Sequence, residues 1–246
     1  TYKDEKNNWV SPDELFTKDG KKYLKNNTSK EVKVGPSESM SKSKKNTIDP
    51  ENIINNYGAD SVRLFILSDS PPEKDVQWSE EGIIASFKFI QKLWSLNEKI
   101  LEEINKNYSK DNSDELIKFT NKFIKKISNN LEGFNYNIII ANLHEMHSYL
   151  SKEIIKGYKK ETILENYKKI LITMMPILPH LSNECFESVK TDKDKFSWPS
   201  YNEKLIKEET CIIVIQINGK KRGLISTQLD LEENDLFQLI KKDQNI

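Results

Sequence analysis

Cysteine is nearly absent from this chain of 246 residues: only Cys185 and Cys211 occur, far apart and outside any CxxC spacing or Cys/His cluster. A disulfide scaffold and a zinc site are therefore not indicated, and a reducing, cytoplasmic location is expected. No stretch approaches the ~20 consecutive apolar residues of a membrane span, and the N-terminus has no signal-peptide core. We therefore expect no association with a membrane.

An excess of charge of either sign is also absent. Lys plus Arg and Asp plus Glu balance at 38 each, so a nucleic-acid role has to depend on local basic patches. Hydrophobic residues make up only 36% and charged residues 31%, which predicts helices with wide polar faces or several small modules. The chain begins at Thr1 without a methionine, and we expect it to be a fragment or a processed piece.

Two segments have the pattern of β structure. In the first 38 residues, a Lys-Asp-Gly turn at residues 18–20 and alternating apolar positions over residues 31–34 predict a small β-rich element of hairpins. From Cys211 onward, an apolar run, the dipeptide Asn218-Gly219 and a second short run predict a hairpin with a two-residue turn. A last helix is predicted over residues 232–242.

Between these segments the sequence is helical. Asp49 is placed to cap a short helix that starts at Pro50 and ends at Gly58, and Asp60 is predicted to cap a second short helix directly after it. Ser79 is then a candidate N-cap for a long helix that reaches about residue 105. Its predicted apolar stripe, which places Trp94 in the core, consists of Ile83, Phe87, Ile90, Leu93, Trp94 and Leu101.

More helices are predicted over residues 114–131, 135–155, 161–175 and 181–189. Long helices joined by short loops are typical of a bundle. The tryptophans at positions 9, 78 and 198 lie in connectors, where packing between modules is the default expectation.

The loop from Glu38 to Asp49, ESMSKSKKNTID, is rich in serine and lysine. Such a run is usually a solvated tether. Here the cap at Asp49 fixes where the loop ends, and Met40 is an apolar residue available for packing. Lysine charges and serine hydroxyls between two ordered elements suit a phosphate group. The glycines of a Walker A loop are missing.

Within this loop, SMSKS resembles the KMSKS signature of the class I aminoacyl-tRNA synthetases. The segments that follow, NTIDP, YGADSVR and SPPEKDVQW, resemble those of the bacterial leucyl-tRNA synthetases, and the similarity extends over essentially the whole chain. NNWVSPDEL resembles their leucine-specific insertion. FNYNIIIANLHEM and MPILPHLSNECFE resemble their helical bundle, and VIQINGKKRG resembles the opening of their C-terminal domain.

The resemblance implies a mainly α fold in four parts. Residues 1–38 would be part of the β-rich leucine-specific insertion, and residues 39–78 the KMSKS-type loop with its connecting short helices. Residues 79–200 would form a helical tRNA-binding bundle of the anticodon-binding type. Residues 201–246 would be the start of an incomplete α+β C-terminal tRNA-binding domain, truncated at its end.

In this family the loop closes on ATP and stabilises its phosphates while leucine attacks the α-phosphate, and leucine is then transferred to tRNA(Leu). The resemblance implies a catalytic role for Lys42 and ATP contacts by Ser39, Met40, Ser41, Lys42 and Ser43. ATP with Mg²⁺, leucine and tRNA(Leu) are the expected substrates and partners of a monomeric full-length enzyme. No metal site is expected in this chain.

The first lysine of the signature does not carry over, because Ser39 occupies its position. One positive charge is thereby lost at the mouth of the site. Whether Lys44 or Lys45 supplies a replacement stays open at this point.

The HIGH motif that class I synthetases pair with this loop is not supplied by His144, His147 or His180. We therefore expect the chain to be inactive alone and its loop to be disordered. HEMH, residues 144–147, has histidines three apart where zincins need four, so a structural or tRNA-facing role is favoured over a metal site.

Three adjacent cations, Lys220, Lys221 and Arg222, follow the predicted hairpin turn. They suit contacts to a tRNA backbone and, equally, a solvated turn. The same two interpretations apply to two lysine clusters in the helical region. The first is Lys122, Lys125 and Lys126, and the second is Lys156, Lys159 and Lys160. Two other functions stay open: a free-standing RNA-binding module, and a sibling class I synthetase for isoleucine, valine or methionine.

Overall fold

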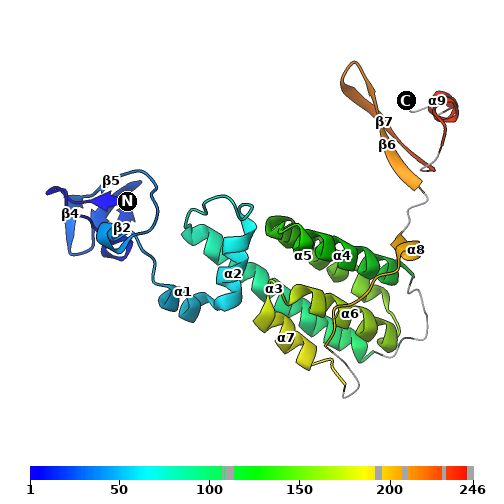
Figure 1. Ribbon diagram of the computed structural model, residues 1–246, viewed down its shortest axis with the longest axis horizontal. Coiled ribbons are helices and arrows are strands. Elements are labelled where there is room, and N and C mark those ends of the chain that lie inside the picture. The colour runs from blue at the N-terminus through cyan, green and yellow to red at the C-terminus, as the bar shows by residue number, and fades with distance from the viewer. Residues whose placement is uncertain (107, 109–113, 192–195, 207–209, 229–230, 243–246) are drawn as a thin grey trace.

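We describe a computed structural model of the chain, which covers residues 1–106, 108, 114–191, 196–206, 210–228 and 231–242. Its described part is mainly α, as the sequence predicts, and is arranged along one long axis. A β-rich unit at the N-terminus occupies one end, a helical bundle the middle, and a hairpin with a final helix the other end (Figure 1). Among the described residues, no helix combines the length and apolarity required to cross a membrane.

The N-terminal unit is built from two small antiparallel sheets. Strand β1 (Tyr2–Lys3) pairs with β5 (Lys33–Val34), and β2 (Leu15–Lys18), β3 (Lys21–Leu24) and β4 (Asn27–Glu31) form a three-stranded meander. The predicted Lys-Asp-Gly turn joins β2 to β3, and its two loop residues, Asp19 and Gly20, have φ of 50° and 77°. A short 3-10 helix, η1 (Pro12–Glu14), precedes β2, and the small apolar core consists of Val10, Leu15 and Val32.

The two short helices after the loop are α1 (Pro50–Tyr57) and α2 (Ala59–Ser68). As predicted, the Asp49 carboxylate accepts a hydrogen bond from the Glu51 N–H at 3.1 Å, and Gly58 ends α1 with a φ of 80°. The predicted cap at Asp60 is wrong. Gly58 is the N-cap of α2, and Asp60 lies inside its first turn, where its carboxylate bonds to another helix.

The bundle consists of α3 (Glu80–Ile104), α4 (Asp114–Glu132), α5 (Tyr136–Glu153), α6 (Lys160–Met174) and α7 (Pro179–Glu187), with a 3-10 turn, η3 (Ile154–Lys156), after α5. These bounds agree with the predictions to within two residues at each end, and the Ser79 hydroxyl caps α3 by accepting from the Gly82 N–H at 3.1 Å. One continuous apolar core runs through the bundle and includes the fully buried residues Ile139 and Leu143 of α5 and Ile170 of α6.

The predicted apolar stripe of α3 is partly wrong. Its buried side chains recur every three or four residues at Ile83, Ser86, Phe89, Leu93, Leu96 and Ile100. Trp94 falls off this row: its side chain is 40% exposed, and its Nε1–H donates to Glu98 Oε1 at 3.2 Å. The large indole therefore lies on the solvent-facing side of the helix and does not fill the core.

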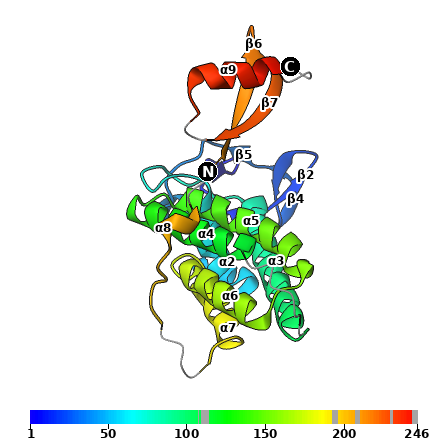
Figure 2. The same ribbon diagram turned by 90° about the vertical axis from the view of Figure 1, so that its right-hand side faces the viewer.

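The C-terminal segment contains α8 (Glu203–Ile206), the hairpin strands β6 (Thr210–Ile217) and β7 (Lys220–Gln228), and α9 (Glu233–Lys242). Asn218 and Gly219 form the predicted two-residue turn, and both have positive φ, 53° and 74°, as a type I′ turn requires. The register shifts by one residue near Ile215, so Arg222 has no cross-strand Cα partner. Figure 2 shows the hairpin and α9 standing off the end of the bundle.

Candidate functional site

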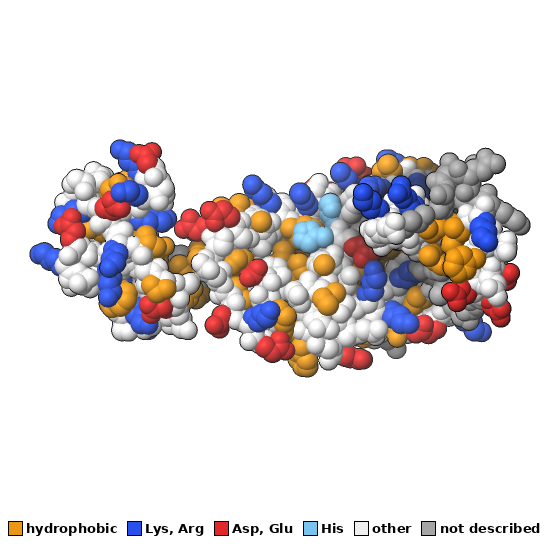
Figure 3. All heavy atoms as spheres, turned by 90° about the horizontal axis from the view of Figure 1, so that it is seen from above, with side chains coloured by type: hydrophobic (Ala, Val, Ile, Leu, Met, Phe, Trp, Pro, Cys, Tyr) orange, Lys and Arg blue, Asp and Glu red, His pale blue; other side chains and the backbone are white. Residues whose placement is uncertain are grey.

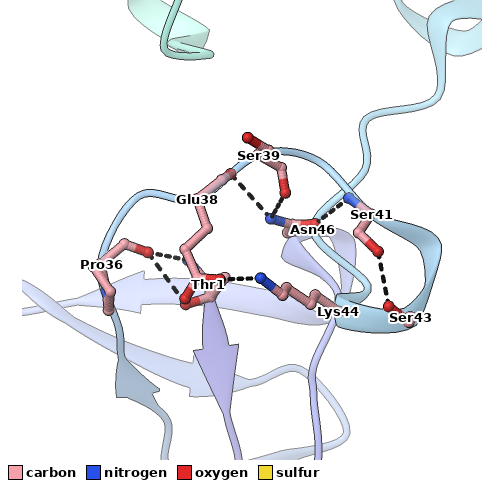
Figure 4. Close-up of polar contacts among 8 residues, drawn as sticks. All are labelled: Thr1, Pro36, Glu38, Ser39, Ser41, Ser43, Lys44 and Asn46. Atoms are coloured by element: carbon pink, nitrogen blue, oxygen red, sulfur yellow. Dashed lines mark hydrogen bonds and ion pairs between the residues drawn. The ribbon is translucent and has the colours of Figure 1, made fainter. Parts of the chain in front are cut away.

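The loop of residues 38–49, which we call the signature loop, has a defined backbone (Figure 4). Its centre is a 3-10 turn, η2 (Lys42–Lys44), closed by hydrogen bonds from Lys44 N–H to the Ser41 carbonyl and from Lys45 N–H to the Lys42 carbonyl, at 3.1 and 3.2 Å. Lys45 ends the turn in the left-handed region, with a φ of 50°. The expectation of a disordered loop is therefore not met in this structure.

Asn46 holds the two ends of the signature loop together. Its Oδ1 accepts the Ser41 N–H at 2.7 Å, and its Nδ2 donates to the carbonyls of Glu38 and Ser39, each at 3.2 Å. Ser41 and Ser43 share a hydroxyl–hydroxyl hydrogen bond of 2.8 Å across the turn. One asparagine thus satisfies three backbone groups of a polar loop, which explains how residues with so little apolar content adopt one shape.

The three lysines of the signature loop differ in their surroundings. Lys44 Nζ forms an ion pair with Glu38 Oε2, and this hydrogen bond lowers the pKa of the Glu38 carboxyl. Lys42 and Lys45 are exposed and form no ion pair with any residue that the structure describes. Met40 is 51% exposed, so its side chain does not pack as an apolar peg in this conformation.

An open cleft of about 2390 Å³ separates the β-rich unit from α1, α2 and the start of α3. Figure 3 shows the β-rich unit as a separate lobe, joined to the helical body at a narrow waist. The signature loop forms part of the wall through Ser39, Met40, Lys44 and Asn46, whereas Lys42 does not line the cleft. Of the five predicted ATP contacts, the structure therefore places two, Ser39 and Met40, on this wall.

Helix α2 anchors the segment that follows the signature loop to the bundle. The Asp60 carboxylate accepts the Leu181 N–H at 2.7 Å in the first turn of α7. Arg63 donates from Nε to the Ile177 carbonyl at 3.0 Å and from Nη2 to the Pro176 carbonyl at 2.7 Å. Both side chains bind backbone groups of the connection between α6 and α7, which we call the α6–α7 corner. Sequence reasoning missed this role because the partners lie more than 100 residues away.

The basic clusters proposed to face tRNA have different environments. Lys220, Lys221 and Arg222 are exposed at the start of β7. In contrast, several lysines of the helical clusters already have acidic partners: Lys125 pairs with Glu203 and Lys126 with Glu145, each at 2.8 Å. Lys156 pairs with Glu153 at the same distance. The hairpin is therefore the better candidate for a phosphate-binding surface.

The histidines of HEMH pack against the bundle. The ring of His144 stacks on Phe89 with a centroid distance of 3.7 Å, and His147 meets the same ring edge-on at 6.0 Å. Loss of hydration lowers the pKa of both histidines. In the part of the chain that the structure describes, no three His, Cys, Asp or Glu side chains gather as a metal-binding group. The predicted structural role fits these contacts.

The predicted packing of tryptophans in connectors holds for two of them. Trp78 meets Phe65 of α2 edge-on at 5.2 Å and so packs the connector against the helix. The Nε1–H of Trp198 donates to the Ser128 hydroxyl of α4 at 2.9 Å. Cys185 is buried with a free thiol, and burial raises its pKa to about 11, whereas the side chain of Cys211 lies outside the described part of the chain.

Two protein families match the sequence. The family described as the anticodon-binding domain of tRNA ligase matches residues 113–236, about half of the chain. The family described as tRNA synthetases class I (I, L, M and V) matches residues 32–79, which include the signature loop, α1 and α2.

Curated relatives cover nearly the whole chain. The leucine–tRNA ligase of Bartonella quintana is 37% identical over 247 residues, 95% of this chain and 28% of that protein. The leucine–tRNA ligase of Rickettsia bellii is 38% identical over 246 residues, 97% of this chain and 29% of that protein. The chain thus spans less than a third of the length of these relatives.

A solved structure shares the fold. It is the ternary complex of the Agrobacterium radiobacter K84 agnB2 LeuRS with tRNA and LeuAMS, which matches with a TM-score of 0.69 and 21% identity over 84% of this chain and 28% of that one. The matched families, the relatives and this fold agree with the resemblance of the signature loop. The chain therefore belongs to the class I tRNA synthetases and, within them, to the bacterial leucyl-tRNA synthetase family.

Proposed function

We propose that this chain is part of a leucine–tRNA ligase, which activates leucine with ATP to leucyl-adenylate and transfers the leucine to tRNA(Leu). The observation that carries this proposal is the signature loop, whose backbone is fixed by Asn46 while Lys42 keeps an exposed ammonium group without an ion pair among the described residues. An exposed lysine ammonium without an ion pair is available to a phosphate.

The formation of leucyl-adenylate requires positive charge near the phosphates of ATP. A leucine carboxylate oxygen forms a bond to the α-phosphorus of ATP, and the bond from that phosphorus to the bridging oxygen of pyrophosphate breaks. Negative charge on the departing pyrophosphate grows during this step. The ammonium of Lys42 stabilises that charge, since electrostatic stabilisation and positioning supply most of the catalysis in phosphoryl and nucleotidyl transfer. In this proposal the signature loop closes over the nucleotide when ATP binds.

Mg²⁺ is expected to accompany ATP, but the signature loop does not fit a magnesium site. Its two carboxylates are already engaged, because Glu38 is paired with Lys44 and Asp49 caps α1. The remaining groups are mainly lysine ammoniums and serine hydroxyls. Magnesium in such sites is held by one or two carboxylates together with substrate phosphates. No step is therefore assigned to a metal held by this loop.

The tRNA is proposed to contact the bundle and the exposed cations of the hairpin, Lys220, Lys221 and Arg222, through its phosphate backbone. The leucine pocket and the HIGH motif would be supplied by other parts of a full-length enzyme, so the chain alone is expected to be inactive. The four parts predicted from the sequence, 1–38, 39–78, 79–200 and 201–246, are retained in this proposal. A monomeric, cytoplasmic enzyme is proposed on the family's pattern.

The test is leucine-dependent pyrophosphate exchange by the full-length ligase that contains this chain. Lys42→Ala is expected to lower the rate of adenylate formation by ~10- to 100-fold, the loss of one charged hydrogen bond, while the KM for leucine stays within about twofold. An unchanged exchange rate would rule out the role of Lys42. An RNA-binding module without a catalytic partner would bind tRNA yet show no exchange in any variant.

A further inference from the structure

The proposed phosphate-binding loop has a missing charge. Where the family signature begins with a lysine, this chain has Ser39, and the side chain of a serine brings no positive charge to the phosphates. Two lysines outside the five-residue signature, Lys44 and Lys45, are near enough in sequence to replace it. The geometry of the loop distinguishes between them.

The chain folds back so that Lys44 lies beside the Ser39 end of the loop. Its Nζ binds the carboxylate of Glu38, the residue directly before Ser39. Asn46 reinforces this return, because its Nδ2 donates to the carbonyls of both Glu38 and Ser39 at 3.2 Å (Figure 4). The ammonium of Lys44 is thus held at Glu38, one residue before the position of the absent lysine.

The cleft gives a second, independent reason to choose Lys44. Ser39, Lys44 and Asn46 line the same cleft wall, and Glu38 lines it as well. Lys45 does not line the cleft, and its backbone leaves the turn in the left-handed conformation, with a φ of 50°. Of the two candidates to replace the missing charge, only Lys44 therefore lies on the cleft wall beside Ser39 in this conformation of the loop.

We propose that Lys44 is a phosphate-contacting residue that replaces the missing first lysine of the signature, and that Glu38 holds its ammonium in place until the triphosphate of ATP displaces the carboxylate. This inference rests on the proposed function of the signature loop. The ligand class is a nucleoside triphosphate, whose several negative charges compete well with one carboxylate.

Glu38 is suited to this holding role. Its hydrogen bond with Lys44 lowers the pKa of the carboxyl, so the group is ionised at neutral pH and the pair is ionic. The side chains of Lys44 and Glu38 are 37% and 31% exposed, and ion pairs this accessible to water are weak and easily exchanged. The pair positions Lys44 without withholding it from a more highly charged partner.

The experiment compares two neutralising variants of the full-length ligase in pyrophosphate exchange at varied ATP. Lys44→Gln is expected to lower kcat/KM for ATP by ~10-fold or more, the scale of one charged hydrogen bond, and Lys45→Gln by less than about twofold. Both variants should keep the wild-type KM for leucine and melting temperature. Equal effects of the two substitutions would overturn the proposal.

A rescue variant separates a charge contact from a structural effect. Adding the absent lysine, as Ser39→Lys with Lys44→Gln, is expected to restore most of the lost kcat/KM for ATP. A double variant no better than Lys44→Gln alone would contradict the replacement of one charge by the other. Glu38→Gln is expected to lower the KM for ATP, because the competing carboxylate is gone, and a raised KM would contradict the displacement of this carboxylate by the triphosphate.

The two proposals fail in different ways. If Lys42→Ala abolishes exchange while Lys44→Gln has no effect, this inference is wrong and the proposed function stands. If neither variant affects exchange, the assignment of the signature loop to ATP is itself wrong.

Discussion

Asp60 on α2 caps the first turn of α7: its Oδ2 accepts the backbone N–H of Leu181 at 2.7 Å, although the two residues lie 121 positions apart in the chain. The carboxylate also lies 3.4 Å from the N–H of His180, and its side chain is buried, with 6% exposure. Negative charge at a helix N-terminus is favourable, because the orphan N–H groups and the helix dipole both attract it. The segment after the signature loop is therefore fixed to the bundle through this contact.

Removing this cap should destabilise the chain. Asp60→Ala leaves N–H groups of α7 without their acceptor, at an expected cost of about 2 kcal/mol in the free energy of unfolding. Asp60→Asn keeps an acceptor oxygen and is expected to cost less than about 1 kcal/mol. Urea denaturation of the 246-residue chain measures both values. Equal losses for the two variants would mean that the charge, and not the hydrogen bond, is what matters.

Two adjacent residues of α3 should differ sharply in their contribution to stability. Leu93 is 4% exposed within the core, whereas Trp94 is 40% exposed on the solvent side. Leu93→Ala is expected to cost about 2–5 kcal/mol in unfolding free energy, because it leaves a cavity. Trp94→Ala is expected to cost about 1 kcal/mol. If the tryptophan proves the more costly of the two, the position of α3 in the bundle is wrong.

Stability should fall in mild acid because of the HEMH segment. Loss of hydration lowers the pKa of His144 and His147 in the folded chain. Nearby positive charge acts in the same direction, from His147 and Lys92 on His144 and from Lys92 and Lys99 on His147. The unfolded chain then binds more protons below the ordinary histidine pKa of ~6.5. The stabilising contribution is thus complete above that pH and is lost as the pH falls towards the lowered pKa values.

Urea denaturation between pH 7.5 and pH 5.5 measures this effect. The double variant His144→Gln with His147→Gln is expected to show a smaller fall in unfolding free energy than the parent chain over this range. The control is His180→Gln, at the histidine in the first turn of α7. Its unfolding free energy should fall between pH 7.5 and pH 5.5 as much as that of the parent chain. Identical slopes for parent and double variant would contradict the prediction.

The hairpin cations should contribute to tRNA binding by charge. Replacing Lys220, Lys221 and Arg222 together by glutamine is expected to weaken binding of tRNA and to reduce the salt dependence of the affinity, because fewer counterions are released. A matched triple replacement on the exposed surface of the β-rich unit, at Lys18, Lys25 and Lys33, is the control. Gel shifts at several salt concentrations give the salt dependence of the tRNA affinity for both triple variants. If this dependence is the same for the two, the hairpin cations do not contact tRNA.

Short-range features of the fold were predictable because their causes are local. The Asp49 cap followed by Pro50, the Asp19-Gly20 and Asn218-Gly219 turns, and the long helices each depend on residues within a few positions of one another. The start of α7 was misplaced by two residues, because Pro179 itself takes the first helical position that suits proline.

Long-range features were not predictable from the pattern alone. Asp60 looked like the cap of its own helix, because a carboxylate near a helix start is usually a local cap. Its actual acceptor role in α7 depends on α2 packing against the α6–α7 corner. Trp94 was assigned to the core because it falls on the predicted apolar stripe, but which face of α3 is buried depends on where the neighbouring helices lie.

The candidate site likewise has features that follow from the sequence and features that follow only from the tertiary structure. The sequence by itself determined the family, the lysine- and serine-rich loop, its fixed end at Asp49 and the absence of a lysine at Ser39, since all of these are properties of neighbouring residues. Only the tertiary structure decided that Asn46 closes the loop and that Lys44, and not Lys45, returns to the Ser39 end against Glu38. The physical reason is that a hydrogen bond or an ion pair forms between atoms that are close in space, and the backbone path sets that closeness.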